Sequence, residues 1–313
     1  MTTPDHAIKG VTSHADMVQA IVAAHAAALA LPVAENAAPV FTGDAAVYRA
    51  AKQACLQIGF IDADAQVIAL AWQSMAARTG SFDATHWPAQ PEDFGLRPWP
   101  RPDAFAACPK RLGLYAVLPD AAWIARMAQA GVPTLQLRFK SDDTGAVERE
   151  VKTAVKAVQG THSLLFINDH WQIAIEAGAY GVHLGQEDMA DANLQKIRAA
   201  GLRLGLSSHG CAEMLRADAH SPSYIAMGAV YATTLKRMVT PPQGPGRLQV
   251  YARLMNTYPL VAIGGIDESR LDAVLASGVG SVAVVRAIVA AEQPEQMAKR
   301  FRLRIEEALK TAI

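Results

Sequence analysis

The stretch SLLFINDHWQIAIEAGAYGVHLGQED, residues 163–188, decides how the rest of the chain is interpreted. Its apolar run 164–167 predicts a strand that is buried on both faces. Residues 170–177 have room for about two helical turns, and Gly178 can end them. A second short apolar run, 180–184, predicts another strand. The stretch is therefore a strand–helix–strand unit, from which parallel sheets are built.

Acidic side chains follow both predicted strands of this unit. Asp169 comes directly after the first strand, beside Asn168, and Asp188 follows the second. Because both strands end at the same edge of a parallel sheet, we expect the two carboxylates to lie close together. Two carboxylates and a substrate phosphate form a typical Mg²⁺ site, so the pair favours a metal. The alternative is that each aspartate caps the helix that follows it.

The composition restricts the class of protein. The chain has 313 residues, of which 51% are hydrophobic, enough for one large core or two domains. Its 29 basic and 29 acidic residues balance, which argues against binding to nucleic acid or to an anionic membrane. Cys55, Cys108 and Cys211 lack the spacing of a zinc site or a disulfide framework and fit a reducing cytoplasm. The apolar stretch 20–34 is too short to span a bilayer and predicts a soluble helix.

The first third of the chain differs in pattern from the rest. Residues 1–86 are rich in alanine and carry apolar residues at helical spacing, which predicts a small helical region. Residues 87–110 are dense in proline and predict an extended connector. Because this connector precedes a complete set of eight strand–helix units, we expect residues 1–110 to be separable from catalysis.

From residue 111 onward, short apolar runs alternate with helical patterns. Eight such units in about 200 residues favour a closed (β/α)8 TIM barrel over residues 111–313. A doubly wound open sheet is the alternative, and the regular spacing of the units favours closure. The predicted strands are 112–118, 134–139, 164–167, 180–184, 202–206, 224–227, 260–263 and 281–285.

Cationic residues end the second predicted strand. Strand alternation places Gln136, Arg138 and Lys140 on one side, which faces into the barrel. Two cations inside a barrel need an anion nearby, and a guanidinium fork with an ammonium group suits a pyrophosphate. The alternative is a salt bridge to a neighbouring strand, for which Asp169 is available.

The fifth predicted strand ends in serine, serine and histidine. Ser207 and Ser208 can bond a phosphate or cap the next helix. His209 is a candidate base, although this is the weaker interpretation. His183, within the fourth strand, is either a substrate contact or a core histidine whose hydrogen bonds are satisfied inside the protein.

The loops after the sixth and seventh strands complete the candidate site. The long loop 232–246 carries Thr233, Thr234 and Lys236, and suits either a cover over a ligand or a solvated surface loop. Glycines 264–265 follow the seventh strand and would let a phosphate approach the backbone. Together the strand ends predict two anion sites and a divalent metal facing one cavity, which suits chemistry driven by a pyrophosphate leaving group.

Several motifs within residues 111–290 resemble, in order and spacing, those of the thiamine phosphate synthase family. They are QLRFK, FINDHW, YGVHLGQED, GLSSH, SYIAMGAV, TTLK and AIGGI, and the resemblance does not extend to the N-terminal region. It implies an Mg²⁺-dependent transferase that joins hydroxymethylpyrimidine diphosphate to a thiazole phosphate and releases pyrophosphate. It also implies a dissociative mechanism, in which pyrophosphate leaves before the thiazole nitrogen captures the pyrimidine-methyl cation.

The resemblance assigns site residues motif by motif. Asp169 and Asp188 would bind Mg²⁺, and the phosphate of the thiazole would meet Thr233, Gly265 and the backbone at 285–286. The family pattern has a threonine and a serine where this chain has Leu235 and Arg286. Either the Arg286 side chain replaces the missing hydroxyl contact, or it points to solvent and only its backbone N–H meets the phosphate. The implied catalytic residues are Arg138, Lys140, Ser207 and Lys236. The implied substrate-binding residues are Gln136, Leu137, Arg138, Phe139, Lys140, Asn168, Ser207, Thr233, Thr234, Leu235, Lys236, Gly265, Val285 and Arg286.

Two other functions are compatible with these residues. A thiazole tautomerase-like isomerase on the same barrel would use a base such as His209 and would need no pyrophosphate site, against which the intact QLRFK motif and both aspartates argue. A non-catalytic thiamine-pathway binding protein would give the N-terminal region a regulatory use. The expected partners are phosphorylated small molecules, with no nucleic acid and no membrane, and a homo-oligomer is left open.

Overall fold

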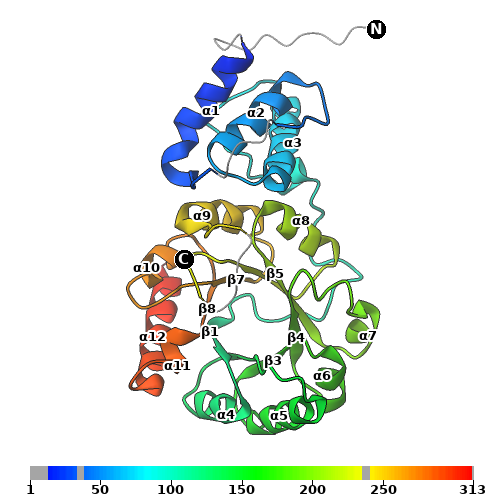
Figure 1. Ribbon diagram of the computed structural model, residues 1–313, viewed down its shortest axis with the longest axis vertical. Coiled ribbons are helices and arrows are strands. Elements are labelled where there is room, and N and C mark those ends of the chain that lie inside the picture. The colour runs from blue at the N-terminus through cyan, green and yellow to red at the C-terminus, as the bar shows by residue number, and fades with distance from the viewer. Residues whose placement is uncertain (1–12, 34–38, 235–239, 312–313) are drawn as a thin grey trace.

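Eight parallel strands within the described residues close into a barrel that helices surround (Figure 1). The computed structural model describes residues 13–33, 39–234 and 240–311. Each strand pairs with its neighbours in sequence order, and the last strand pairs with the first. This closed order confirms the predicted (β/α)8 barrel and excludes the doubly wound sheet.

All eight strands lie within two residues of their predicted positions. They are β1 (Gly113–Leu118), β2 (Thr134–Leu137), β3 (Leu164–Asn168), β4 (Gly181–Leu184), β5 (Arg203–Ser208), β6 (Tyr224–Met227), β7 (Leu260–Ile263) and β8 (Ser281–Val284). The helices around them are α4 (Ala121–Gln129), α5 (Thr144–Ala157), α6 (Trp171–Ala177), α7 (Leu194–Ala199), α8 (Cys211–Ala219), α9 (Gly244–Leu254), α10 (Leu271–Leu275), α11 (Arg286–Val289) and α12 (Pro294–Thr311).

Side chains alternate along each strand between the barrel interior and the helix layer. On β1, Tyr115 belongs to the interior cluster, whereas Leu114 joins the larger apolar cluster that includes the helices. The interior is filled by aromatic rings, and the centres of the Phe166 and Tyr224 rings lie 5.1 Å apart. Residue 205 must be glycine, because a Cβ there would lie 2.1 Å from the Tyr224 ring. The barrel is therefore a packed core, with room for a ligand only at its ends.

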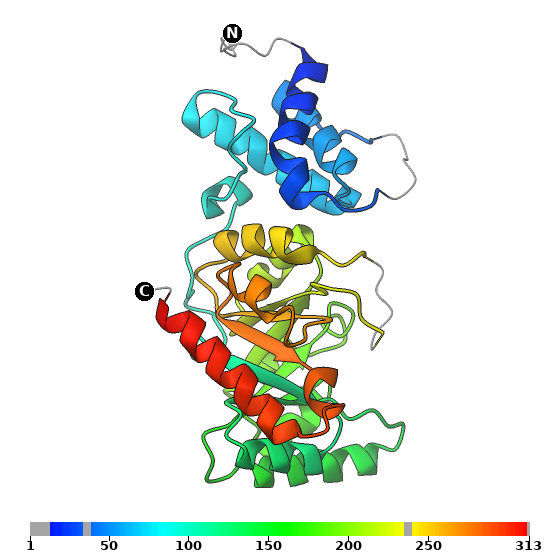
Figure 2. The same cartoon turned by 90° about the vertical axis from the view of Figure 1, so that its left-hand side faces the viewer.

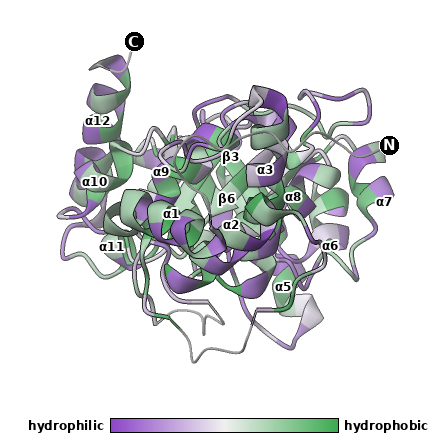
Figure 3. Cartoon of the chain, turned by 90° about the horizontal axis from the view of Figure 1, so that it is seen from above, coloured by the Kyte–Doolittle hydropathy of each residue, from purple (hydrophilic) through white to green (hydrophobic). Residues whose placement is uncertain are grey.

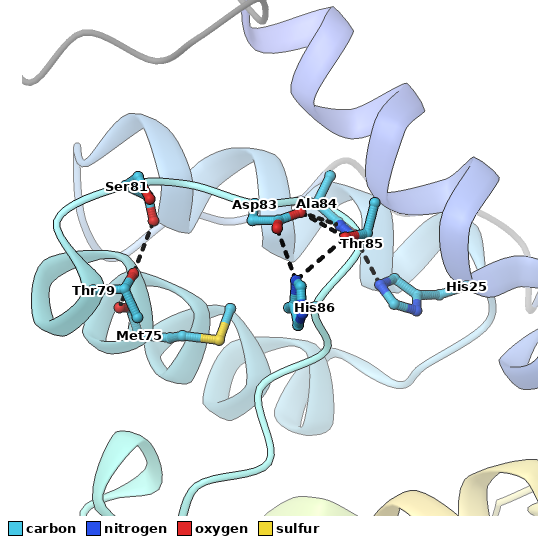
Figure 4. Close-up of polar contacts among 8 residues, drawn as sticks. All are labelled: His25, Met75, Thr79, Ser81, Asp83, Ala84, Thr85 and His86. Carbon is cyan, nitrogen blue, oxygen red and sulfur yellow. Dashed lines mark hydrogen bonds and ion pairs between the residues drawn. The ribbon is translucent and has the colours of Figure 1, made fainter.

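The helices α1 (His14–Leu29), α2 (Ala46–Gln57) and α3 (Asp62–Thr79) form the helical region that was predicted before the barrel (Figure 1). Seen from above, hydrophilic and hydrophobic residues are mixed along these helices (Figure 3). Their apolar residues Ile21 and Trp72 are fully buried. The loop after α3 is tied back to α1, because the His25 ring bonds Ala84 O at 2.9 Å (Figure 4). The limits 1–86, 87–110 and 111–313 stay predictions.

The N-terminal helices lie against two helices of the barrel (Figures 1 and 2). Contacts join α3 to α8 and α1 to α9. Buried apolar side chains of both parts belong to one continuous cluster. The N-terminal region is therefore packed on the outer side of the barrel, next to the helices that follow β5 and β6.

The proline-rich connector packs on the barrel. It contains a short 3-10 helix, η1 (Pro91–Phe94). Its later residues reach the residue before β6, because Ser223 Oγ donates to Ala106 O at 2.6 Å. Arg101 is 8% exposed, forms an ion pair with the Asp218 carboxylate of α8, and donates to Ser221 Oγ at 3.1 Å. The backbone N–H of Phe105 donates to Ser221 O at 3.0 Å. Residues 101–105 are therefore held against the barrel by hydrogen bonds and a buried ion pair.

Two smaller expectations concern the cysteines and the membrane. The thiols of Cys55, Cys108 and Cys211 are buried and none forms a disulfide, as their spacing predicts. Among residues 13–33, 39–234 and 240–311, no helix is both long enough and apolar enough to cross a membrane.

Candidate active site

Polar side chains converge inside the barrel at the carboxyl ends of four neighbouring strands. Gln136, Asn168, His183 and Ser207 come from β2, β3, β4 and β5, and the paired register places Asn168 beside His183. Gln136, Asn168 and His183 are at most 8% exposed, and Ser207 is half-buried. The structure thus brings together three residues that were predicted from three separate motifs, with His183 between them.

A chain of buried hydrogen bonds fixes the direction of the two amides. Tyr115 OH donates to Gln136 Oε1 at 3.0 Å, so its oxygen must accept the proton of Tyr224 OH, 2.7 Å away. Gln136 Nε2 then donates to Asn168 Oδ1 at 2.8 Å. Because the oxygen of Asn168 faces Gln136, its NH2 group is directed away from that contact. An amide that presents its donors in this way suits an anionic ligand.

The same chain assigns the tautomer of His183. The proton of Tyr224 is directed at Tyr115, so His183 Nδ1, 2.7 Å from Tyr224 OH, must donate. A neutral ring protonated at Nδ1 would accept at Nε2 from Ser207 OH, 2.8 Å away. Burial raises the pKa of Tyr224 and of Tyr115 well above the usual range, so both phenols keep their protons. His183 is therefore a core histidine that orients Ser207.

Tyr115, Tyr224 and Gln186 are site residues that the sequence patterns did not single out. In the sequence both tyrosines look like ordinary aromatic residues of a strand. The one sequence feature that could have marked Tyr224 is Gly205 on the neighbouring strand, which leaves room for its ring. Gln186 Nε2 donates to Ser207 O at 2.6 Å, and its Oε1 is buried without a partner in the described part of the chain. A buried acceptor left unpaired costs about 1–3 kcal/mol, so we expect a ligand group or a water molecule to bond it.

Asp169 and Asp188 lie beside each other at the same edge of the barrel. Asp169 has a φ of 63°, a left-handed conformation that aspartate adopts more readily than most residues, and it turns the chain from β3 into α6. Asp188 Oδ2 accepts from Gly185 N at 3.0 Å. Burial raises the pKa of Asp188, and the charge of Asp169 raises it further. Each carboxylate therefore lies in the field of the other.

Neither aspartate caps a helix. The N-cap of α6 is His170, without a side-chain bond, and α7 is capped by Asn193, whose Oδ1 accepts from Lys196 N at 3.0 Å. The capping explanation of the two aspartates is therefore excluded.

The residues after β2 lie differently from the prediction. The strand ends at Leu137, so Arg138, Phe139 and Lys140 lie in the loop beyond it, and the expected strand end at residue 139 is wrong. Lys140 Nζ donates to Asp169 Oδ2 at 2.6 Å, which is the salt bridge named as the alternative. Its side chain is 57% exposed, so Lys140 stands at the mouth of the barrel and not inside it. Leu137 is 1% exposed and packs toward the helices, away from the other site residues.

The ends of β7 and β8 form the opposite side of the site. Gly265 has a φ of 63°, and a Cβ there would lie 2.5 Å from Ala232 O, so glycine lets the β7 loop pass against the β6 loop. Val285 follows β8 and is half-buried. Arg286 is exposed at the start of α11. The structure thus places Gly265, Val285 and Arg286 on neighbouring strand ends.

The loop after β6 is described only in part. Thr233 is half-buried and Thr234 is exposed, directly after the segment that packs against Gly265. Leu235 and Lys236, both predicted to bind substrate, lie outside the described residues. Their assignment stays a prediction.

The comparisons with known proteins agree on one family. A family model described as thiamine monophosphate synthase matches residues 114–288, more than half of the chain. The thiamine-phosphate synthase of Neisseria meningitidis serogroup A is 54% identical over 191 residues, which cover 61% of this chain and 93% of the relative. That of Cronobacter sakazakii is 50% identical over 187 residues, which cover 60% and 89%.

A solved structure supports the same likeness. The thiamine phosphate pyrophosphorylase from Pyrococcus furiosus superposes with a TM-score of 0.56 at 26% identity, covering 63% of this chain and 97% of its own. Since each match takes nearly the whole of the relative, these relatives have no room for a counterpart of the N-terminal helical region.

Proposed function

The chain belongs to the thiamine monophosphate synthase family, and from this premise we propose that it couples 4-amino-2-methyl-5-(diphosphooxymethyl)pyrimidine to 4-methyl-5-(2-phosphoethyl)thiazole. The products are thiamine phosphate and pyrophosphate. The observation that supports this best is that Lys140, Asp169 and Asp188 lie together at the mouth of the barrel. Gln136 and Asn168 lie just below them, inside the barrel. A cation, two carboxylates and two amides together suit a diphosphate that arrives with a divalent metal ion.

Asp169 and Asp188 are the residues that would hold Mg²⁺. Burial and the charge of Asp169 raise the pKa of Asp188, and a divalent cation between the two carboxylates would favour the charged form of Asp188. The part of the chain that the structure describes has no group of three or more histidine, cysteine or acidic ligands, so most of the remaining coordination would fall to the diphosphate and water. Bound Mg²⁺ would neutralise charge on the departing pyrophosphate.

The reaction we propose is dissociative. The bond between the pyrimidine methylene carbon and the diphosphate oxygen breaks first, and its electron pair leaves with pyrophosphate. The thiazole nitrogen then donates its lone pair to the electron-poor methylene carbon. That nitrogen carries no proton, so the reaction needs positioning and charge stabilisation more than a strong base. This agrees with the contacts of His183, whose two ring nitrogens bond Tyr224 and Ser207 within the barrel.

The residues divide between the two substrates. Arg138 and Lys140 would stabilise the negative charge that develops on the leaving oxygen, and Gln136, Asn168 and Ser207 would hold the pyrimidine diphosphate. For the thiazole phosphate, we propose Thr233, Gly265 and the backbone of Val285 and Arg286. Lys236, from the loop after β6, would bind the pyrimidine diphosphate.

Arg138→Lys is expected to raise both the KM for the pyrimidine diphosphate and the inhibition constant of pyrophosphate by about tenfold. Lysine keeps the charge but loses the bidentate fork that matches a phosphate. Initial rates with added pyrophosphate measure both constants. The matched control is Arg149→Lys on α5, where the side chain is 72% exposed, and it should change neither constant. Unchanged inhibition by pyrophosphate in Arg138→Lys would leave this arginine a structural residue.

The proposed function is tested by giving the purified protein both phosphorylated substrates with Mg²⁺ and measuring thiamine phosphate and pyrophosphate. Formation of both supports the synthase. Isomerisation of a thiazole without coupling would indicate the tautomerase-like isomerase, and binding without turnover would indicate the binding protein.

A further inference from the structure

The N-terminal helical region contacts the barrel at α8 and α9, the helices that follow β5 and β6 (Figures 1 and 2). The segment before α8 carries Ser207, and the segment before α9 carries Thr233 and Thr234. The relatives described above have no room for such a region. The contact therefore joins an added part of this chain to two loops of the candidate site.

Asp64, in the first turn of α3, caps the barrel helix α8. Its side chain is 3% exposed, and its Oδ1 accepts from Ala212 N at 2.8 Å. The N-cap residue of α8 is Gly210, which has no side chain to accept such a bond. Asp64 thus supplies, from a position 148 residues earlier in the chain, the acceptor that a serine or aspartate at residue 210 would provide.

The glycine at residue 210 makes room for this carboxylate. A Cβ there would lie 2.2 Å from Asp64 Oδ2. Only two residues separate Gly210 from the inward-facing Ser207. The second of them, His209, donates its backbone N–H to Glu213 Oε2, in the first turn of α8, at 2.9 Å. The backbone that carries Ser207 therefore runs directly into the contact with Asp64.

Arg247 of α9 makes the reciprocal contact with the N-terminal helices. Its guanidinium is 2% exposed and donates to Leu29 O at 2.9 Å and to Ile58 O at 3.0 Å, carbonyls at the C-terminal ends of α1 and α2. It also lies 3.6 Å from the centre of the Phe60 ring. A carboxylate meets the positive end of one helix and a cation meets the negative ends of two others, as helix dipoles favour.

The negative charge of Asp64 does not stabilise the folded protein. Burial raises the pKa of Asp64, although the N–H of Ala212 and the charge of Arg247 oppose this. Because the folded-state pKa is raised, the folded protein loses stability as the pH rises from the unfolded-state pKa toward the folded-state pKa. An asparagine would offer the same Oδ1 acceptor to Ala212 N without this cost, and would give up the contact of the carboxylate with the N–H of Cys211.

We propose that Asp64 is a positioning residue for the pyrimidine half of the reaction. By capping α8, it would hold the segment 207–210 in the place where Ser207 meets His183 and the substrate. This inference rests on the proposed function, because the family motif assigns Ser207 to the pyrimidine diphosphate.

Asp64→Ala is expected to raise the KM for the pyrimidine diphosphate about fivefold, the size of a typical N-cap loss. Without the cap, the segment would occupy its competent position for only part of the time, and the apparent affinity falls by that fraction. The KM for the thiazole phosphate and kcat should each change less than twofold. Steady-state kinetics of the full-length protein, with thermal unfolding alongside, measure these values.

Two further variants separate positioning from general stability. Asp62→Ala is the matched control, because Asp62 lies on the same helix turn but pairs with Lys52, at 2.9 Å, inside the N-terminal region. It should lower Tm without changing either KM. Asp64→Asn keeps the Oδ1 acceptor and should recover most of the KM, to within about twofold of the unmodified protein.

The outcomes distinguish this inference from the proposed function. Equal KM changes in Asp64→Ala and Asp62→Ala, or an unchanged KM with a lower Tm in Asp64→Ala, would reduce Asp64 to a structural residue. If Asp64→Ala does not fold, Gly210→Ala decides, because its Cβ would displace the carboxylate and should raise the same KM about fivefold. A normal KM in folded Gly210→Ala overturns the inference. Failure of the unmodified protein to form product would instead refute the proposed function.

Discussion

Asp188→Ala is expected to lower kcat by about 10³-fold while the barrel stays folded. A divalent cation that neutralises a leaving pyrophosphate supplies several kcal/mol of transition-state stabilisation, and this carboxylate is one of its two proposed protein ligands. The structural cost should be small, because the hydrogen bond that the Asp188 carboxylate accepts from Gly185 N contributes about 1 kcal/mol. Turnover across a Mg²⁺ titration, with circular dichroism as the folding check, measures both effects.

Glu187→Ala is the matched control for this prediction. Glu187 is the adjacent acidic residue and is exposed, so its loss should leave kcat and the Mg²⁺ dependence unchanged. For the partner carboxylate, Asp169→Asn is a better variant than alanine, because asparagine also tolerates the left-handed backbone at φ 63°. If Asp188→Ala keeps near-normal activity at limiting Mg²⁺, the pair of carboxylates is not a metal site.

A protein that starts at Pro109 is expected to lose coupling activity because its barrel is destabilised. The truncation removes Arg101, the cation paired with the Asp218 carboxylate, and breaking a buried pair costs about 3–5 kcal/mol. Arg247 loses its acceptors Leu29 O and Ile58 O in the same step. Such losses are a large share of the 5–15 kcal/mol, roughly, that stabilises a typical domain. Thermal unfolding and the coupling rate measure the effect.

A shorter truncation, which starts at residue 96, is the control. It keeps Arg101 and Phe105 on the barrel and removes the N-terminal helices together with Asp64. We expect it to fold with a lowered Tm and to show the raised KM for the pyrimidine diphosphate that Asp64→Ala shows. A folded and fully active protein starting at Pro109 would contradict this account and support the separability that the proline-rich pattern predicts.

The sequence predicted the barrel well because strands buried on both faces appear as continuous apolar runs. Gln136 faces the barrel interior as strand alternation predicts, whereas Asn168 and Ser207, predicted to follow their strands, belong to β3 and β5. Lys140 was misplaced because alternation was extended beyond the last paired residue of β2, Leu137, which pairs with Leu118. Arg138 N still donates to Leu118 O at 2.8 Å, but the strand alternation no longer holds as far as Lys140.

Contacts between distant segments could not be predicted from spacing. The hydroxyl groups of Tyr115 and Tyr224 meet only because the barrel closes, which no local pattern of β1 or β6 encodes. Asp64 reads as a favourable first-turn residue of its own helix, yet its hydrogen bond is to Ala212 of the barrel. Neither contact can be recognised from the residues next to these side chains in the sequence.

The most direct test of the proposed synthase reaction is a product assay on the full-length protein. Both phosphorylated substrates are supplied with Mg²⁺, and thiamine phosphate and pyrophosphate are quantified over time, with Asp188→Ala measured in parallel. The account predicts equal amounts of the two products, a rate that disappears when Mg²⁺ is chelated, and almost no product from the variant. Folded protein that binds both substrates but releases no pyrophosphate would contradict it.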